Sequence, residues 1–214
     1  MTTTDERGGR TAWRPLLAAF LVVLALGGGL LLGQGMDDGA PRVDSPVDVG
    51  FAQDMKIHHA QAVEMSAIAH RRAADPKLSY LALDILTTQQ GQIGLMSGYL
   101  DLWGQTQTST GPVMAWMGDE QAGSMPGMAT DEQIEALKTL PVPQMEEQFL
   151  RLMIRHHAGA VPMAAYQVEH GTSEQLVALA RGMEKGQAAE IDLMQSMLME
   201  RGLEMEPGVG HSGH

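Results

Sequence analysis

The sequence predicts an all-α protein whose main domain is a four-helix bundle built from two copies of one helical hairpin. Aromatic residues make up only 4% of the 214 residues, while 17 methionines join the aliphatic residues as core formers. This composition suits packed helices better than sheets. The chain also repeats itself at an offset of 98 residues, and each copy carries the start and stop residues of two long helices. Four amphipathic helices of matched length can bury their apolar faces only against one another.

Charge and cysteine content narrow the classes of partner. A formal net charge of -12 repels nucleic-acid phosphates, so we expect no nucleic-acid partner. The chain has no cysteine, which excludes disulfides and thiolate metal sites. Any soft metal must therefore be bound by methionine sulfur and histidine nitrogen.

The N-terminal 35 residues have the pattern of a membrane anchor or an export signal. Residues 16–35 are uncharged and mostly apolar, close to the roughly 20 residues that span a bilayer. Arg7, Arg10 and Arg14 precede this run, and Asp37 and Asp38 follow it. The charge asymmetry predicts a cytoplasmic segment 1–15, a transmembrane helix 16–35, and a single-pass cell-membrane protein whose C-terminal domain is extracytoplasmic. Secretion after signal cleavage is the alternative, and residues 36–45, rich in Gly, Pro and Asp, predict a linker.

The remainder of the chain is an internal duplication. The segment FAQDMKIHHAQAVEM at 51–65 aligns with FLRLMIRHHAGAVPM at 149–163, and the same offset continues without gaps through the following helix. Duplication of a two-helix unit is the economical explanation. It divides a bundle at 46–202 into hairpin 1 at 46–103, a connection at 104–142 and hairpin 2 at 143–202. Residues 203–214 are expected to form a flexible, histidine-containing tail.

Cap and break residues place the helix ends. Ser45 and Asp75 each precede a proline, which combines an N-cap with a favourable first helical residue. In the connection, Thr130 and Gln133 have the spacing of a capping box and predict a short helix. The remaining ends are marked by Gly104, Pro143, Gly171, Ser173 and Gly202.

The first helix of each copy carries a His-His pair between methionines, on the face that points into the bundle. Successive helical residues are about 100° apart, so Met55, His58 and Met65 lie on one face together with His59. Thioether sulfur and imidazole nitrogen suit Cu(I) and its congener Ag(I), whereas Ca or Mg would require oxygen. Burying four imidazoles without partners costs free energy, which argues against simple packing. The predicted metal ligands are Met55, His58, His59, Met65, Met153, His156, His157 and Met163.

Other side chains are candidates for supporting this site. Asp54 lies one turn before His58, where a carboxylate can orient the imidazole. Gln89 and Gln187 occupy equivalent positions on the second helices, where they either form a polar network around the metal or face solvent. Core packing is the competing interpretation for the methionines of those helices. The supporting set is Asp54, Gln89, Met96, Gln187, Glu190 and Met194.

These ligands predict a binding protein rather than an enzyme, with Cu(I) or silver as the metal and no organic cofactor. A di-iron bundle requires Glu-x-x-His and a zincin requires His-Glu-x-x-His, and neither spacing occurs in the sequence. We expect a protein that buffers or delivers Cu(I), with the membrane, a metal-receiving protein or a second copy of the chain as partners. Two alternatives stay open: a metal-free bundle that docks another protein through a methionine-rich face, and a metalloenzyme.

Motifs in both hairpins resemble domain-of-unknown-function family 305. Its members carry Met-x-x-His-His followed by small residues and Met, then Gln-x-x-Glu-Ile-x-x-Met on the next helix. The matching segments here are MKIHH at 55–59, QQGQIGLM at 89–96, MIRHH at 153–157, QAAEIDLM at 187–194 and, in the connection, MPGMAT at 125–130. Gln92 stands where the family has Glu, whereas Glu190 matches. The resemblance implies a ferritin-like fold and extracytoplasmic binding of copper or silver linked to metal tolerance.

Overall fold

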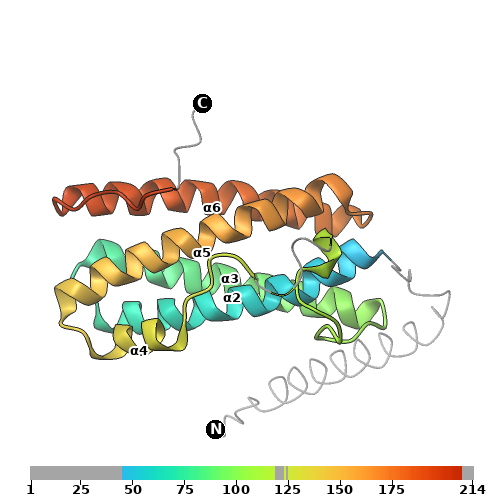
Figure 1. The fold of residues 1–214 in the computed structure, drawn as a ribbon, viewed down its shortest axis with the longest axis horizontal. Helices are drawn as coiled ribbons and strands as arrows, with labels where there is room; N and C mark the ends of the chain where they lie inside the picture. The colour runs from blue at the N-terminus through green and yellow to red at the C-terminus, as the bar shows by residue number, and fades with distance from the viewer. Residues whose placement is uncertain (1–44, 119–122, 124, 209–214) are drawn as a thin grey trace, which may run out of the picture. The chain divides into compact units, whose positions relative to one another are not determined.

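A computed structural model describes residues 45–118, 123 and 125–208. Across these residues the chain forms five α-helices and one short 3-10 helix, with no strand. Four of the helices are long and form two hairpins, and α4 lies in the connection between them (Figure 1). The elements are α2 (Pro46–Arg72), α3 (Pro76–Leu102), η1 (Ala115–Met117), α4 (Asp131–Thr139), α5 (Val142–His170) and α6 (Glu174–Glu200).

The helices begin at the predicted caps. The side chains of Ser45, Asp75 and Ser173 accept hydrogen bonds from the first turns of α2, α3 and α6. Thr130 and Gln133 form both bonds of the expected capping box at α4. Each cap satisfies a backbone N–H that has no partner within its helix. Four of the five α-helices in the described residues therefore begin at predicted caps, whereas α5 begins at Val142, one residue before Pro143 and without a side-chain cap.

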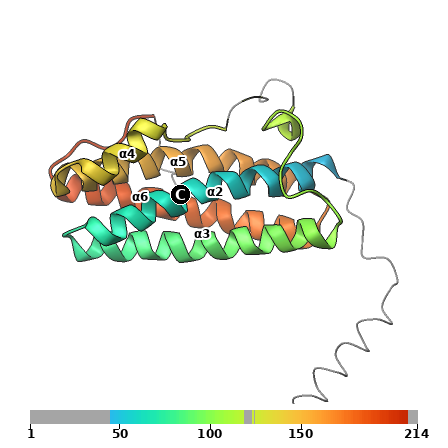
Figure 2. The same ribbon diagram turned by 90° about the horizontal axis from the view of Figure 1, so that it is seen from below.

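The two hairpins pack through their first helices. The close packing pairs are α2 with α3, α5 with α6, and α2 with α5, whereas α3 and α6 do not approach each other as closely. Figure 2 shows α2 and α3 side by side along their lengths. The start of α2 meets the end of α5, since Asp48 accepts a hydrogen bond from Gln167, so these two helices are antiparallel. The arrangement is consistent with a ferritin-like helical fold.

Each hairpin holds the turn of the other through a carboxylate. Asp48 on α2 accepts hydrogen bonds from the backbone N–H groups of Thr172 and Ser173, in the turn before α6. Glu146 on α5 accepts from the backbone N–H groups at residues 74 and 75, in the turn before α3. The two sets of residues are related by the 98-residue offset. The hairpins are therefore joined with approximate twofold symmetry.

The core divides into two apolar clusters with the histidines between them. One cluster contains Met65 and Met153, and the other contains Met55 and Met163. Along both α2 and α5, the His-His pair lies between the methionine of one cluster and that of the other. The bundle interior is thus apolar, then polar, then apolar along its length.

The connection lies against both first helices. Its 3-10 helix η1 contacts α2, and its helix α4 contacts α2 and α5. Gln61 on α2 exchanges two hydrogen bonds with the backbone of Ala129. Gly159 on α5 lies directly under Pro126, because a Cβ on Gly159 would be 2.1 Å from the Pro126 carbonyl oxygen. Only glycine allows this approach.

Two predictions on the chain ends have different outcomes. Segments 1–15 and 16–35, and the linker up to residue 44, lie outside the described residues; within the described part of the chain, no helix is long and apolar enough to cross a membrane. The prediction that the flexible tail begins at residue 203 is wrong, because Leu203 and Glu206 are both held by the bundle. Leu203 packs on the core, and the carboxylate of Glu206 pairs with Arg151 and Arg155. Apolar burial and ion pairing hold this segment.

Candidate metal centre

The four histidines of the two His-His pairs form one buried layer. His58, His59, His156 and His157 are each 0% exposed. The rings of His58 and His156 meet where α2 and α5 cross, with ring centroids 3.8 Å apart. The two copies of the motif thus come together at the centre of the molecule.

The central pair donates to backbone carbonyl groups. Nε2 of His58 lies 3.0 Å from the carbonyl oxygen of Pro126, and Nε2 of His156 lies 3.0 Å from that of His58. A carbonyl oxygen can only accept, so Nε2 carries the hydrogen in both rings. The neutral rings therefore carry their lone pairs on Nδ1.

The outer pair binds side chains of the second helices. Nε2 of His59 lies 2.7 Å from the amide oxygen of Gln92, and Nε2 of His157 lies 2.6 Å from a carboxylate oxygen of Glu190. Both contacts also assign the hydrogen to Nε2. A carboxylate partner makes an imidazole a more basic ligand than an amide partner does. The two outer histidines are thus held in the same way but polarised differently.

All four Nδ1 atoms lack a hydrogen-bond partner among the described residues, and all are buried. A buried, unsatisfied polar atom costs about 1–3 kcal/mol. Four such atoms in one layer are therefore unfavourable unless something binds their lone pairs. A soft cation that accepts imidazole nitrogen fits this requirement.

Burial lowers the affinity of His58, His59 and His156 for protons. Burial, together with repulsion from neighbouring imidazoles, lowers the pKa of His58 to about 4 and that of His59 to about 3. The pKa of His156 is also well below its ordinary value, again chiefly because of burial. Neutral imidazoles are the form that binds metal. These rings are therefore ready to bind a cation at neutral pH.

The predicted methionine ligands are all buried, and they form two groups that each combine methionines of both hairpins. Met55 and Met163 share one apolar cluster with Met96, whereas Met153 and Met65 share the other with Met194. Each group thus takes its methionines from both hairpins. The structure gives two equivalent thioether groups, one on either side of the imidazole layer. Within the described ranges, no three histidine, aspartate or glutamate side chains form a group that could hold one metal ion.

The two predicted glutamines face each other between α3 and α6. Gln89 and Gln187 line one pocket of about 80 Å³ and are 3% and 5% exposed. Neither amide has a hydrogen-bond partner in the described part of the chain. Of the two alternatives for Gln89 and Gln187, facing solvent is therefore wrong, because both side chains occupy a buried polar position.

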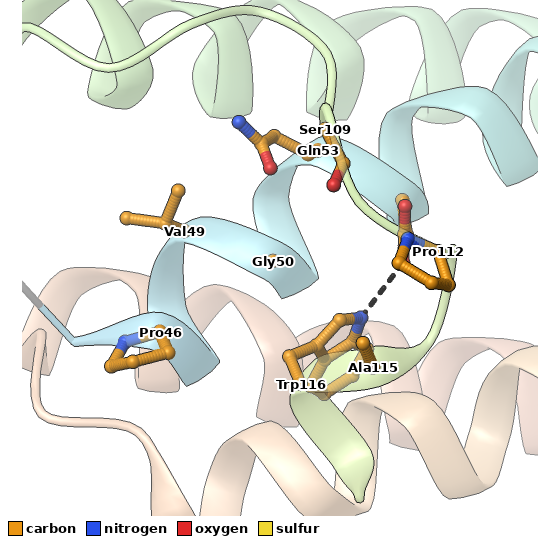
Figure 3. Close-up of a pocket in the computed structure, with 9 residues that line it drawn as sticks. Pro46, Val49, Gly50, Gln53, Ser109, Pro112, Ala115 and Trp116 are labelled. Atoms are coloured by element: carbon orange, nitrogen blue, oxygen red, sulfur yellow. Dashed lines mark hydrogen bonds between the residues drawn. The ribbon is translucent and has the colours of Figure 1, made fainter. Parts of the chain in front are cut away.

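The predicted contact between Asp54 and His58 is wrong. One carboxylate oxygen of Asp54 accepts from the backbone N–H of Met114 at 2.7 Å and from the indole N–H of Trp116 at 2.9 Å. Figure 3 shows Trp116 beside Gly50 in the pocket where η1 meets α2. The carboxylate of Asp54 thus holds the connection, because both of these hydrogen bonds come from that segment.

Sequence reasoning missed two partners of the layer. The carbonyl oxygen of Pro126 has no sequence signal of its own, although it lies within the MPGMAT segment at 125–130 that resembles the family. Gln92 appeared only as a departure from a family motif, yet its amide takes the place of the carboxylate of Glu190.

Fold and site together define a class of protein: a duplicated helical hairpin with a buried layer of histidines between two groups of methionines. Residues 48–198 match the family DUF305, a domain of unknown function, and the chain belongs to that family. The comparison with curated protein sequences finds no match.

Solved structures of similar proteins agree with this assignment. A DUF305 protein from Streptomyces coelicolor, inferred to be secreted, is 46% identical, with a TM-score of 0.71 over 78% of this chain and 97% of that one. A DUF305 fragment from Deinococcus radiodurans is 38% identical, with a TM-score of 0.62 over 72% of this chain and 97% of that one. CopM in its Cu(I)-bound form is 27% identical, with a TM-score of 0.57 over 72% of this chain and 96% of that one. CopM has also been solved with Cu(II) and with silver.

Proposed function

We propose that this protein binds a soft metal ion, Cu(I) or Ag(I), and serves to buffer, tolerate or deliver it. The observation that carries the proposal is the layer of four buried imidazoles whose Nδ1 atoms have no partner, placed between two methionine groups. Imidazole nitrogen and thioether sulfur are the ligands that such ions prefer. The ligands would be drawn from Met55, His58, His59, Met65, Met153, His156, His157 and Met163.

Similar proteins support the choice of metal. CopM, at 25–30% identity, has been solved bound to Cu(I), Cu(II) and silver. The imidazoles can serve either oxidation state of copper, whereas thioethers favour Cu(I). We therefore propose a binding protein, with the metal as its cargo.

We further propose that the bundle works outside the cytoplasm. The charge asymmetry around residues 16–35 favours an anchor with the bundle on the far side of the membrane, and the inferred secretion of the Streptomyces coelicolor relative supports that side. Cell fractionation with carbonate extraction should leave the full chain in the membrane pellet. Recovery of a shortened chain from the medium would indicate signal cleavage instead.

A competition titration tests the metal proposal. Under anaerobic conditions, the wild-type protein should take Cu(I) from a chromophoric chelator. His58→Ala/His156→Ala should lose this ability, because it removes the imidazoles at the centre of the layer. His170→Ala is the matched control, since His170 is exposed at the end of α5 and outside the layer. Equally weak binding by wild type and the double variant would overturn the proposal.

A second variant removes sulfur without opening a cavity. Met55→Leu/Met163→Leu keeps volume and apolarity, and such exchanges cost less than about 1.5 kcal/mol of stability. It should fold and bind Cu(I) more weakly. Met145→Leu is the control, because Met145 is a buried core methionine about 12 Å along α5 from Met153. Unchanged affinity in the double variant would exclude the thioethers of Met55 and Met163 as ligands.

A further inference from the structure

The pocket between α3 and α6 lies on the approximate twofold axis of the molecule. It is lined only by residues of these two helices. Three pairs related by the 98-residue offset meet in it: Gln89 with Gln187, Gln92 with Glu190, and Thr88 with Gly186. Equivalent residues of two related halves can meet only at the axis that relates them. His58 and His156 meet on the same axis, so the pocket and the centre of the imidazole layer are aligned.

The lining of the pocket leads directly to the imidazoles. Gln92 and Glu190 each line the pocket and each hold an outer histidine, His59 and His157 respectively. The other carboxylate oxygen of Glu190 makes no hydrogen bond within the described ranges. Together with the unpartnered amides of Gln89 and Gln187, it offers oxygen atoms to a hydrated cation. Most of the side chains that line the pocket are therefore polar.

The other sides of the layer are covered. On the outer face of α2 and α5, Pro126 binds His58 and lies in backbone contact with Gly159. Toward either end of the bundle, the layer is bounded by the two apolar clusters. An ion moving through those clusters would have to shed its water among methionine, leucine and phenylalanine side chains.

We infer that this pocket is the opening through which a metal ion reaches and leaves the imidazole layer, with the two glutamines and Glu190 as its polar lining. The inference rests on the proposed function. Two glycines of α6, Gly182 and Gly186, contribute to the opening because they leave it free of side chains: a Cβ at either position would meet nothing within 4 Å. A larger residue there would fill the opening without disturbing the core.

The test places a leucine in the opening. Gly186→Leu should slow the release of Cu(I) into excess bathocuproine disulfonate by about tenfold or more in stopped-flow absorbance, while the equilibrium affinity stays unchanged. This chelator is bulky and charged, so it can collect only released ions. Gly98→Leu is the matched control, since Gly98 is also an exposed helix glycine with open space around it but does not line the pocket. It should release Cu(I) at the wild-type rate.

A second measurement needs no metal. Hydrogen exchange of the His157 Nε2–H, followed by NMR on the metal-free protein, should slow in Gly186→Leu and not in Gly98→Leu. If both release and exchange run at the wild-type rate in Gly186→Leu and in Gly182→Leu, the inference is overturned. If wild type binds no Cu(I), the proposed function fails, and the exchange measurement still decides whether the pocket is the route to the layer.

Discussion

The two hairpins share one design but differ where a single connection must be accommodated. Asp48 and Glu146 hold opposite turns in the same way, and both His-His pairs lie in the same layer. The connection has no second copy. It therefore makes equivalent residues do different things: Nε2 of His58 donates to the connection, whereas Nε2 of His156 donates to α2. Duplication supplies the symmetric frame, and the unique segment makes the two halves of the site unequal.

Acid should break the layer on which the hairpins meet, and this is the largest effect that we predict. His58 and His59 have an ordinary pKa of 6.5 but bind protons in the folded protein only at about 4 and 3. At pH values between the ordinary pKa and the pKa in the folded protein, the unfolded chain binds more protons than the folded protein does. The free energy of unfolding therefore falls as pH falls. Each histidine contributes about 1.4 kcal/mol per pH unit in this window. For these two histidines together we expect the free energy of unfolding to fall by about 4 kcal/mol between pH 7 and pH 5.

Urea unfolding at a series of pH values measures this slope. The window above pH 5 isolates the histidines, because hydrogen bonds from Thr172 and Gln167 outweigh burial and hold the pKa of Asp48 below its ordinary 3.8. His59→Gln should reduce the slope by the share of one histidine. A free energy of unfolding that stays constant between pH 7 and pH 5 would contradict the buried, neutral layer.

Asp48 and Glu146, whose carboxylates each hold the turn of the opposite hairpin, should contribute unequally to the free energy of unfolding. Asp48 is 0% exposed and accepts from two backbone N–H groups and two side chains, whereas Glu146 is 8% exposed and accepts from two backbone N–H groups. Asp48→Ala leaves these buried donors unsatisfied and should cost about 3 kcal/mol. Glu146→Ala should cost about half as much. Denaturant unfolding compares them, and equal costs would mean that burial does not distinguish the two contacts.

Local signals in the sequence predicted the helices and the duplication, because caps and a constant offset are encoded residue by residue. Ser45, Asp75 and Thr130 act as predicted. The meeting of His58 with His156 was not predictable, since it depends on which helix faces pack. Asp54 failed for a related reason: its neighbour one turn away was visible in the sequence, but its donors come from a segment 60 residues later.

Substituting the α2 residue that contacts the connection should destabilise the protein less than substituting the equivalent residue of α5. At offset-related positions, Gln61 binds Ala129 through its side chain, whereas Gly159 lies in backbone contact with Pro126. Gly159→Ala forces backbone atoms apart and should cost about 2 kcal/mol. Gln61→Ala removes two hydrogen bonds and should cost about 1 kcal/mol. Gly94→Ala, with open space around it, should be neutral or stabilising. Thermal unfolding of the three variants gives the order, and a neutral Gly159→Ala would show that the connection can move away.

A further expected effect concerns the difference between the two outer histidines, His59 and His157, and it rests on the proposed function. Glu190 accepts from His157 as a carboxylate, whereas Gln92 accepts from His59 as an amide. Losing a carboxylate behind an imidazole weakens metal binding by about 10–100-fold in known sites. We expect Glu190→Gln to weaken Cu(I) binding by about tenfold, because it removes the carboxylate that accepts from His157. We expect Gln92→Glu to strengthen Cu(I) binding, because it places a carboxylate at the equivalent position behind His59. Chelator competition on both variants measures the change in Cu(I) affinity.

Opposite shifts in affinity of similar size would mean that the two halves contribute alike to one layer. A shift in Glu190→Gln alone would mean that the metal is bound mainly on the side of His157. No shift in either variant would contradict a ligand role for the outer histidines.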